Sequence, residues 1–88
     1  MKTEFLSHFY KDLDSLSNKA AKTALIRVIQ NVEAANSVIE IPNMKKLAGH
    51  KSAYRIRIGD FRLGIFVEKK KIIFARIMHR KQIYRSFP

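Results

Sequence analysis

Three arginines, Arg55, Arg57 and Arg62, lie where apolar and basic residues alternate along the chain. A period of two predicts β-strands, in which alternate side chains point to opposite faces of a sheet. Gly59-Asp60 separates two such runs and predicts a two-residue hairpin turn. With this turn, Arg57 lies opposite Arg62 and Arg55 opposite Gly64. All three guanidinium groups then share one face, where planar donors and a permanent charge suit phosphate binding.

Three further residues, His79, Arg80 and Tyr84, follow the last predicted strand and extend this cluster. Cleavage of an RNA phosphodiester needs activation of the 2′-hydroxyl, stabilisation of extra charge on phosphorus and protonation of the 5′-oxygen. Arginine stabilises charge but carries protons poorly, so His79 and Tyr84 are the nearby groups with usable proton chemistry. Alternatively, His79 caps a strand end and Tyr84 fills the edge of the core. The candidate catalytic residues are Arg57, Arg62, His79, Arg80 and Tyr84.

A second set of residues could bind the backbone and bases of RNA around this cluster. Gly64 is expected to leave the arginine face flat, and Phe66 to offer an aromatic platform on which a base stacks. The remaining members are basic side chains from the same half of the sequence. The candidate RNA-binding residues are Lys45, Lys46, His50, Lys51, Arg55, Phe66, Arg76, Lys81 and Arg85.

The charge of the 88-residue chain is concentrated in its second half. The sequence has 18 Lys and Arg against seven Asp and Glu, a formal net charge of +11. Residues 1–44 are balanced, so the whole excess lies in residues 45–88. A basic surface that serves only solubility has no reason to avoid one half of the chain. The segregation therefore favours a partner that carries negative charge, such as a nucleic acid, an acidic protein or a membrane surface.

Several classes of function are disfavoured by what the sequence lacks. Cysteine is absent, which excludes a disulfide framework, a thiol nucleophile and a cysteine-based zinc site. His8, His50 and His79 show no metal-ligand spacing, and there is no glycine-rich phosphate loop, so we expect neither a metal nor a cofactor. No apolar run is long enough for a membrane span and no leader pattern opens the chain, so we expect a cytoplasmic protein without a membrane partner.

The elements that must position these residues follow from periodicity. Residues 2–6 suggest a short first strand. Apolar residues at helical spacing predict helices over about 8–16 and 19–35, with Ser7 and Asn18 as N-caps, and these two helices are expected to form an antiparallel hairpin. We interpret 37–52 as a connecting loop with one helical turn at 44–47.

Three strands are then expected, over 54–58, 61–67 and 72–78, followed by an irregular or single-turn helical tail. In the third strand, Ile73, Ala75 and Ile77 should face the helices, and Phe74, Arg76 and Met78 the open face. The sequence therefore predicts a single α+β domain over 1–88, with two layers: the helical hairpin packs on one face of an antiparallel β-meander, and the other face is open to water.

Two runs carry a family resemblance, Tyr54–Arg62 (YRIRIGDFR) within 47–63, and His79–Arg85 (HRKQIYR) within 77–85. With the opening helix pair, they resemble the RelE/ParE superfamily of bacterial and archaeal type II toxins over nearly the whole chain. The resemblance implies a RelE/ParE-like fold, a cognate acidic antitoxin that covers the basic face, and metal-independent cleavage of mRNA on the ribosome. The ParE-like branch, which inhibits DNA gyrase, shares much of this pattern.

The resemblance also implies roles for individual residues. Arg62 and Arg80 match arginines of the RelE-like branch, and Tyr84 is similar to its stacking or proton-handling tyrosine. Arg55 and Arg57 stand where that branch often has lysines, which keeps the charge but removes any group able to act as a base. We expect an endoribonuclease, an mRNA interferase. The alternatives are a gyrase inhibitor, a non-catalytic basic module that binds RNA or the ribosome, and an inactive family member.

Overall fold

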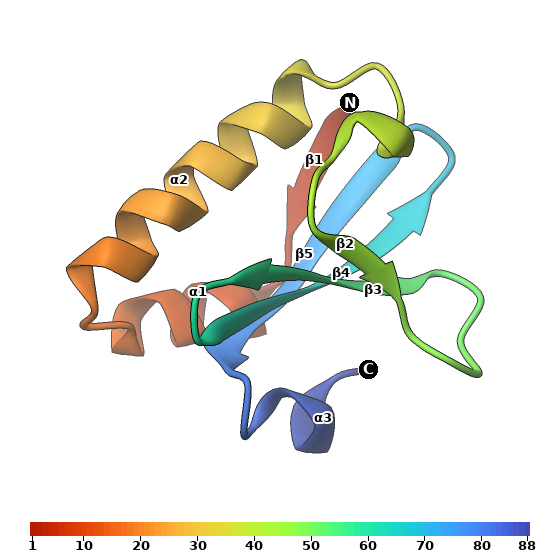
Figure 1. Cartoon of the computed structure of the whole chain (residues 1–88). Helices are drawn as coiled ribbons and strands as arrows, with labels where there is room; N and C mark the ends of the chain where they lie inside the picture. Colours follow the sequence, from red (N-terminus) through yellow and green to blue (C-terminus); the bar gives the residue numbers. More distant parts are fainter.

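The computed structural model describes residues 1–88 and is built around a five-stranded mixed sheet (Figure 1). The strands are β1 (Lys2–Phe5), β2 (Met44–Lys46), β3 (Ala53–Ile58), β4 (Phe61–Glu68) and β5 (Lys71–His79). Their spatial order is β1-β5-β4-β3-β2; β1 runs parallel to β5, and every other pair is antiparallel. The helical segments are α1 (Ser7–Ser15), α2 (Lys19–Ala34), the 3-10 turn η1 (Val38–Glu40) and α3 (Ile83–Ser86). The predicted α+β class, the first strand, the meander and the single-turn tail are confirmed.

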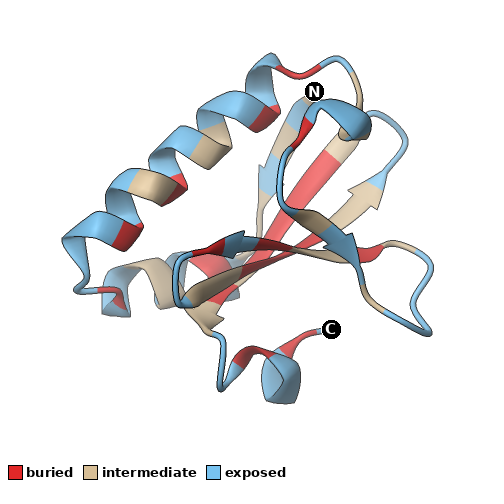
Figure 2. Ribbon diagram, in the orientation of Figure 1, coloured by how far each residue is buried: buried red, intermediate tan, exposed pale blue.

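The main core lies between the sheet and the two long helices. Phe9 of α1 and Leu25 of α2 are 1% exposed, and they pack with Leu63 and Ile65 of β4, which are fully buried. Buried residues therefore lie along the sheet-facing side of α2, while its outer side is exposed (Figure 2). Burial of each large aliphatic or aromatic side chain stabilises the fold by about 1.5–3 kcal/mol, so this layer fixes the sheet on which the basic residues sit.

The predicted N-cap of α2, Asn18, is confirmed, whereas the predicted N-cap of α1, Ser7, is wrong. The Asn18 side chain accepts a hydrogen bond from the backbone N–H of Ala21 at 2.9 Å, which caps α2. At α1 the cap position belongs to Leu6, which has no side chain able to cap, and Ser7 is already helical. The two helices diverge from residues 16–18 (Figure 1), so that α1 packs on β5 and α2 packs on β1 and β3.

The central hairpin forms with the predicted register. Arg57 pairs with Arg62 and Arg55 with Gly64. Gly59 has a positive φ of +57°, whereas Asp60, the second turn residue, does not have a positive φ. A positive φ at the first turn residue alone is typical of a type II′ turn, which favours glycine there. Because the turn sets the register, the three arginines reach one face of the sheet.

The prediction of a helical turn at 44–47 is wrong, because these residues form the edge strand β2. Asn43, with a φ of +62°, turns the chain, and its carbonyl accepts from the Arg57 N–H at 3.3 Å. Lys45 then pairs with Arg55 on β3. An isolated three-residue run carries no β signal of its own; pairing with an existing strand decides its conformation.

A bulge overturns part of the predicted orientation of β5. Gly64 pairs with Arg76 but Ile65 pairs with Phe74, which leaves Ala75 as the extra residue. As a result, Phe74 faces the helices and is fully buried in the main core, whereas Ala75 belongs to a second cluster on the other face. Ile73 pairs with Phe66 and shares that second face. Ile77 and Met78 lie where the alternation predicted.

Helix α1 covers the part of the β5 edge that β1 leaves open. Beyond the last β1 pair, the Leu6 N–H still donates to the Phe74 carbonyl at 3.0 Å. Further along, Asp12 of α1 accepts a hydrogen bond from the Ile77 N–H at 3.1 Å. This edge therefore offers few free backbone groups to another chain. None of the helices combines the length and apolarity that a membrane span requires.

Candidate functional site

The basic face consists of Lys45, Arg55, Arg57 and Arg62, which come from three neighbouring strands. Lys45, Arg55 and Gly64 form one cross-strand row, and Arg57 and Arg62 form the next. Side chains of directly paired antiparallel residues lie on the same face of a sheet, so Lys45 joins the three arginines. The strand β2 thus extends the predicted cluster by one cation, through a pairing that the sequence did not reveal.

Arg62 lies at the centre of this charge. Its guanidinium donates to the carbonyls of Gly59 and Phe61, both at 2.8 Å, which holds it against the hairpin turn. Partial burial lowers the pKa of Arg62 below its ordinary value, and the charges of Arg55, Arg57 and Arg80 lower it further. Tyr84 acts in the opposite direction and raises this pKa. Four other predicted site residues therefore interact electrostatically with Arg62, their common neighbour.

Arg80 and Tyr84 reach Arg62 through the turn that follows β5. The Arg80 N–H donates to the Asp60 carbonyl at 2.8 Å, which ties this turn to the β3–β4 hairpin. The chain then forms α3, in which Ile83 is fully buried and Tyr84 is 59% exposed. The alternative that Tyr84 fills the core edge is therefore wrong, because Ile83 takes that place and leaves the phenol ring in solvent.

Part of the face predicted to be open is covered by the C-terminal segment. Ile83 and Phe87 are buried in a second cluster with Ala53 and Ala75. The Phe87 ring lies on Gly64, and its centroid is 5.1 Å from that of Phe66. Gly64 therefore does not leave a flat exposed surface, and Phe66 is not a free stacking platform. The uncovered part is the basic face, with Arg80 and Tyr84 beside it.

His79 does not join the basic face. It pairs with Phe61, and the two rings meet edge to face at 5.7 Å. Phe61 packs against the main core under the helices, so His79 points to the helical side, opposite to Arg62. Its Nδ1 accepts a hydrogen bond from the Lys81 N–H at 3.2 Å. This geometry matches the alternative in which His79 caps the strand end.

Arg76 is engaged in a bidentate ion pair with Asp12. Its Nε and one terminal nitrogen donate to the two carboxylate oxygens at 2.7 and 3.0 Å. These bonds raise the pKa of Arg76, and only 21% of its side chain and 13% of that of Asp12 are exposed. The charge of Arg76 is thus compensated within the fold, and we leave it out of the proposed RNA-binding surface.

The other basic candidates are dispersed around the site. Lys46 pairs with Tyr54, which packs against the main core, so it points away from Lys45. His50 and Lys51 lie in the exposed loop between β2 and β3, at the opposite end of β3 from the hairpin turn. Lys81 and Arg85 are exposed on either side of Tyr84. These last two can extend the basic face along α3.

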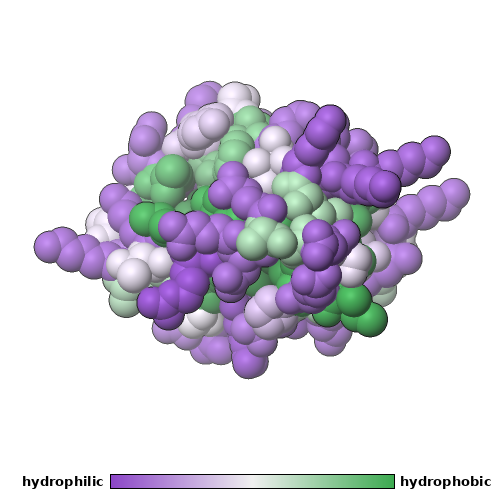
Figure 3. Space-filling model, turned by 90° about the horizontal axis from the view of Figure 1, so that it is seen from above, coloured by the Kyte–Doolittle hydropathy of each residue, from purple (hydrophilic) through white to green (hydrophobic).

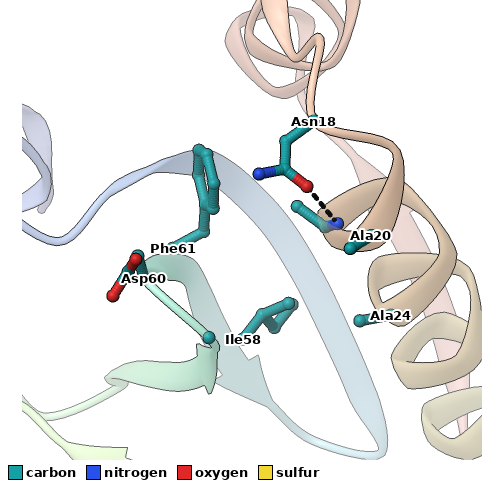
Figure 4. A pocket seen from close by; sticks show the side chains of 8 residues that line it. Asn18, Ala20, Ala24, Ile58, Asp60 and Phe61 are labelled. Atoms are coloured by element: carbon teal, nitrogen blue, oxygen red, sulfur yellow. Dashed lines mark hydrogen bonds between the residues drawn. The ribbon is translucent and has the colours of Figure 1, made fainter.

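The basic face is an open surface rather than a cavity. A cleft of about 300 Å³ lies between the start of α2 and the β3–β4 hairpin, lined by Asn18, Ala24, Ile58 and Phe61 among others (Figure 4). None of the candidate catalytic side chains lines it. Seen from above, long hydrophilic side chains cover most of the visible surface, with apolar atoms between them (Figure 3). No three His, Asp or Glu side chains come together as metal ligands.

Two residues of the site region, Asp12 and Phe87, were not predicted from the sequence. Asp12 comes from the balanced half of the chain, and only the tertiary fold brings it to Arg76. Phe87 had a weak signal: it lies four residues after Ile83, and apolar residues at this spacing share one face of a helix. Both residues act on the site through packing or charge compensation, and neither belongs to the basic face.

Comparison with known proteins agrees with this fold. The sequence model described as the ParE toxin of the type II toxin–antitoxin system parDE matches residues 4–84. The chain is 38% identical to Toxin RelE3 of Methanocaldococcus jannaschii over the full length of both. This chain therefore belongs to the ParE toxin family of type II toxin–antitoxin systems, within the RelE/ParE superfamily.

Solved structures of this superfamily share the architecture. The RelB–RelE antitoxin–toxin complex from Methanococcus jannaschii contains a chain that superimposes with a TM-score of 0.83 at 35% identity, covering 97% of this chain and 99% of that one. The RelE–RelB complex from Pyrococcus horikoshii gives a TM-score of 0.71 at 24% identity, covering 93% and 97%. The second likeness shows the fold alone.

Proposed function

We propose that this toxin is an endoribonuclease that cleaves mRNA without a metal ion while the mRNA is bound to the ribosome. The observation that carries the proposal is the convergence of Arg55, Arg57, Arg80 and Tyr84 around Arg62 on an uncovered surface. Fixed cations at a phosphodiester stabilise the charge that develops on phosphorus. The proposed substrate places the toxin in the cytoplasm.

The roles follow from position and chemistry. Arg62, held by the carbonyls of Gly59 and Phe61, and Arg80 stabilise the additional charge on phosphorus. Tyr84 stacks on a base or handles a proton, because it is the one member of the cluster with an aromatic ring and a hydroxyl that can both donate and accept a hydrogen bond. Arg57 also binds the reacting phosphate, together with Arg62 and Arg80. Lys45 and Arg55 hold the neighbouring phosphates.

The cluster has too few proton carriers to complete the reaction by itself. With His79 on the opposite face, a single phenol remains for a reaction that both removes and supplies a proton. Positioning of the RNA must therefore contribute much of the rate, because a well-oriented 2′-hydroxyl needs less help from a base. The ribosome is the partner that would impose this geometry on mRNA.

The proposed antitoxin partner follows from charge and from the relatives. The second half of the chain carries the whole excess charge of +11, and similar RelE chains were solved in complexes with RelB. We propose that an acidic antitoxin segment covers the basic face and competes with RNA for it. Binding between surfaces of opposite charge is fast and depends strongly on salt.

The test is to induce the toxin in cells and map the ends of cellular RNA. The parent toxin should stop growth and produce new mRNA ends. Arg62→Ala and Arg80→Ala should each abolish both effects while the circular dichroism spectrum stays unchanged. Arg27→Ala removes an exposed arginine of α2 on the other side of the molecule and should leave the parent activity intact. If Arg62→Ala and Arg80→Ala remain fully toxic, the assigned site is wrong.

Other outcomes would identify the alternative functions. Inhibited DNA supercoiling with intact mRNA would indicate a gyrase inhibitor. Binding of RNA that weakens steeply with salt, without cleaved product, would indicate a non-catalytic RNA- or ribosome-binding module. Neither toxicity nor binding would indicate an inactive family member.

A further inference from the structure

The C-terminal helix α3 is attached to the sheet by two side chains one turn apart. Ile83 is fully buried and Phe87 is 3% exposed, whereas Tyr84 is 59% exposed. The two anchors rest on a shallow hollow formed by three small residues, Ala53, Gly64 and Ala75, which come from three neighbouring strands. Small residues at all three places let the C-terminal segment approach the backbone of the sheet closely.

Gly64 is the part of this hollow that touches Phe87. A Cβ built on Gly64 would lie 2.7 Å from both Cγ and Cδ2 of the Phe87 ring. Carbon atoms in van der Waals contact are about 3.5–4.0 Å apart. The atoms involved belong to the root of a buried ring, so the ring cannot simply swing its tip away. Any side chain at position 64 would therefore push Phe87 off the sheet.

We propose that Phe87, seated on Gly64, is a positioning residue that holds Tyr84 beside Arg62. The inference rests on the proposed function, because it gives Tyr84 a task in RNA cleavage. The Phe87 ring is buried on Gly64, beside Arg55 in the same cross-strand row, and it carries no charged or polar group, so it acts on Tyr84 through α3. Because α3 is short, the buried contact of Phe87 also fixes the position of the Tyr84 phenol, which lies three residues earlier in the chain.

Anchoring is necessary because α3 cannot hold its own shape. It has four residues, and isolated helices much longer than this are marginal in water. Its backbone bonds run from the Arg85 N–H to the Gln82 carbonyl at 3.1 Å and from the Phe87 N–H to the Ile83 carbonyl at 2.8 Å. When Phe87 leaves the hollow, the second bond loses its support and Tyr84 is free to move away from Arg62.

The experiment compares three variants of the full chain with the parent toxin. Phe87→Ala removes the anchor, Gly64→Ala fills the hollow, and Phe87→Leu keeps an apolar side chain at the anchor position. Ser86→Ala, at an exposed position of the same helix, is the matched control. Amide hydrogen exchange at positions 85 and 87 reports whether the backbone hydrogen bonds of α3 remain formed. Single-turnover cleavage on ribosomes programmed with a defined mRNA measures the rate of the cleavage step. Binding of a single-stranded RNA oligonucleotide measures the affinity of the basic face for RNA.

Phe87→Ala and Gly64→Ala should speed exchange at both α3 amides and slow cleavage by about 100-fold, since a small misplacement of a catalytic group has effects of this size. Oligonucleotide affinity should stay within about twofold, because the cations that set it are untouched. Phe87→Leu should recover most of the cleavage rate, and Ser86→Ala should equal the parent. A general loss of stability would instead speed exchange in the β4–β5 core as well, and that result would overturn the positioning role.

The failure of this inference is distinguishable from failure of the proposed function. Fast exchange in α3 together with an unchanged cleavage rate would overturn the positioning role and leave RNA cleavage standing. Unchanged exchange in Phe87→Ala would show that the ring does not anchor the helix. A parent toxin that leaves programmed mRNA intact would remove the proposed function, and the task of Tyr84 with it.

Discussion

Replacement of Asp12 by alanine should destabilise the fold by about 3 kcal/mol. The Asp12 carboxylate accepts three hydrogen bonds, two from Arg76 and one from the Ile77 N–H. A hydrogen bond to a charged group contributes about 1.5–3 kcal/mol, and loss of one partner of a buried pair costs about 3–5 kcal/mol. The exposed fractions of 13% and 21% place this pair near the lower end of the second range.

Urea denaturation followed by circular dichroism measures this loss. A domain of 88 residues has a total stability of about 4–13 kcal/mol, so the midpoint should shift strongly while the slope stays constant. Asp14→Ala removes an exposed carboxylate from the same helix and should change stability by less than about 0.5 kcal/mol. The double variant Asp12→Ala/Arg76→Ala should be more stable than Asp12→Ala alone, because it leaves no unpaired charge.

Two results would refute this reasoning. A loss below about 1 kcal/mol in Asp12→Ala would place the pair among exposed surface ion pairs, which contribute little. A reduced RNA affinity of the double variant, with a smaller dependence on salt, would show that Arg76 contacts phosphate after all. We expect its RNA affinity to equal that of the parent.

Three further predictions concern charge and backbone strain. Arg57→Thr should stabilise the fold by about 0.5 kcal/mol while it abolishes toxicity, because Arg57 directly opposes Arg62; an unchanged midpoint in low-salt urea titrations would contradict this. Lys45→Glu should weaken RNA binding more than Lys46→Glu, since these neighbours point to opposite faces; equal losses in salt-titrated binding would refute the assignment. Lys70→Gly should raise the thermal midpoint, because Lys70 has a φ of +52°, where a side chain costs about 1 kcal/mol; a lowered midpoint in calorimetry would be the contrary result.

The central hairpin could be predicted because its determinants are local. Gly59-Asp60 sets the turn, the turn sets the register, and the register places Arg57 opposite Arg62. The same alternation also predicts the face of the sheet to which His79 points. Since a period of two places Met78 on the open face, the next residue along the strand must point to the other face. The place of His79 was thus readable from the sequence.

The remaining errors come from long-range contacts. The bulge at Ala75 has no local signature in the sequence, and it reverses the expected faces of Ile73 and Phe74. The ion pair of Arg76 depends on Asp12, which lies 64 residues away. Phe87 covers Gly64 only because α3 turns the chain back over the sheet. In each case the tertiary fold decided which local preference prevailed.

The pairing of β1 with β5 joins the earliest segment of the chain to one of the latest. During synthesis, Lys2–Phe5 emerges long before Lys71–Phe74, its only partner in the sheet. Contacts between such distant segments form late, because a long loop must close first. Arg80 and Tyr84 are added later still. The proposed site around Arg62 is therefore assembled only after residues 71–84 have been made, because β5 and α3 position Arg80 and Tyr84 beside it.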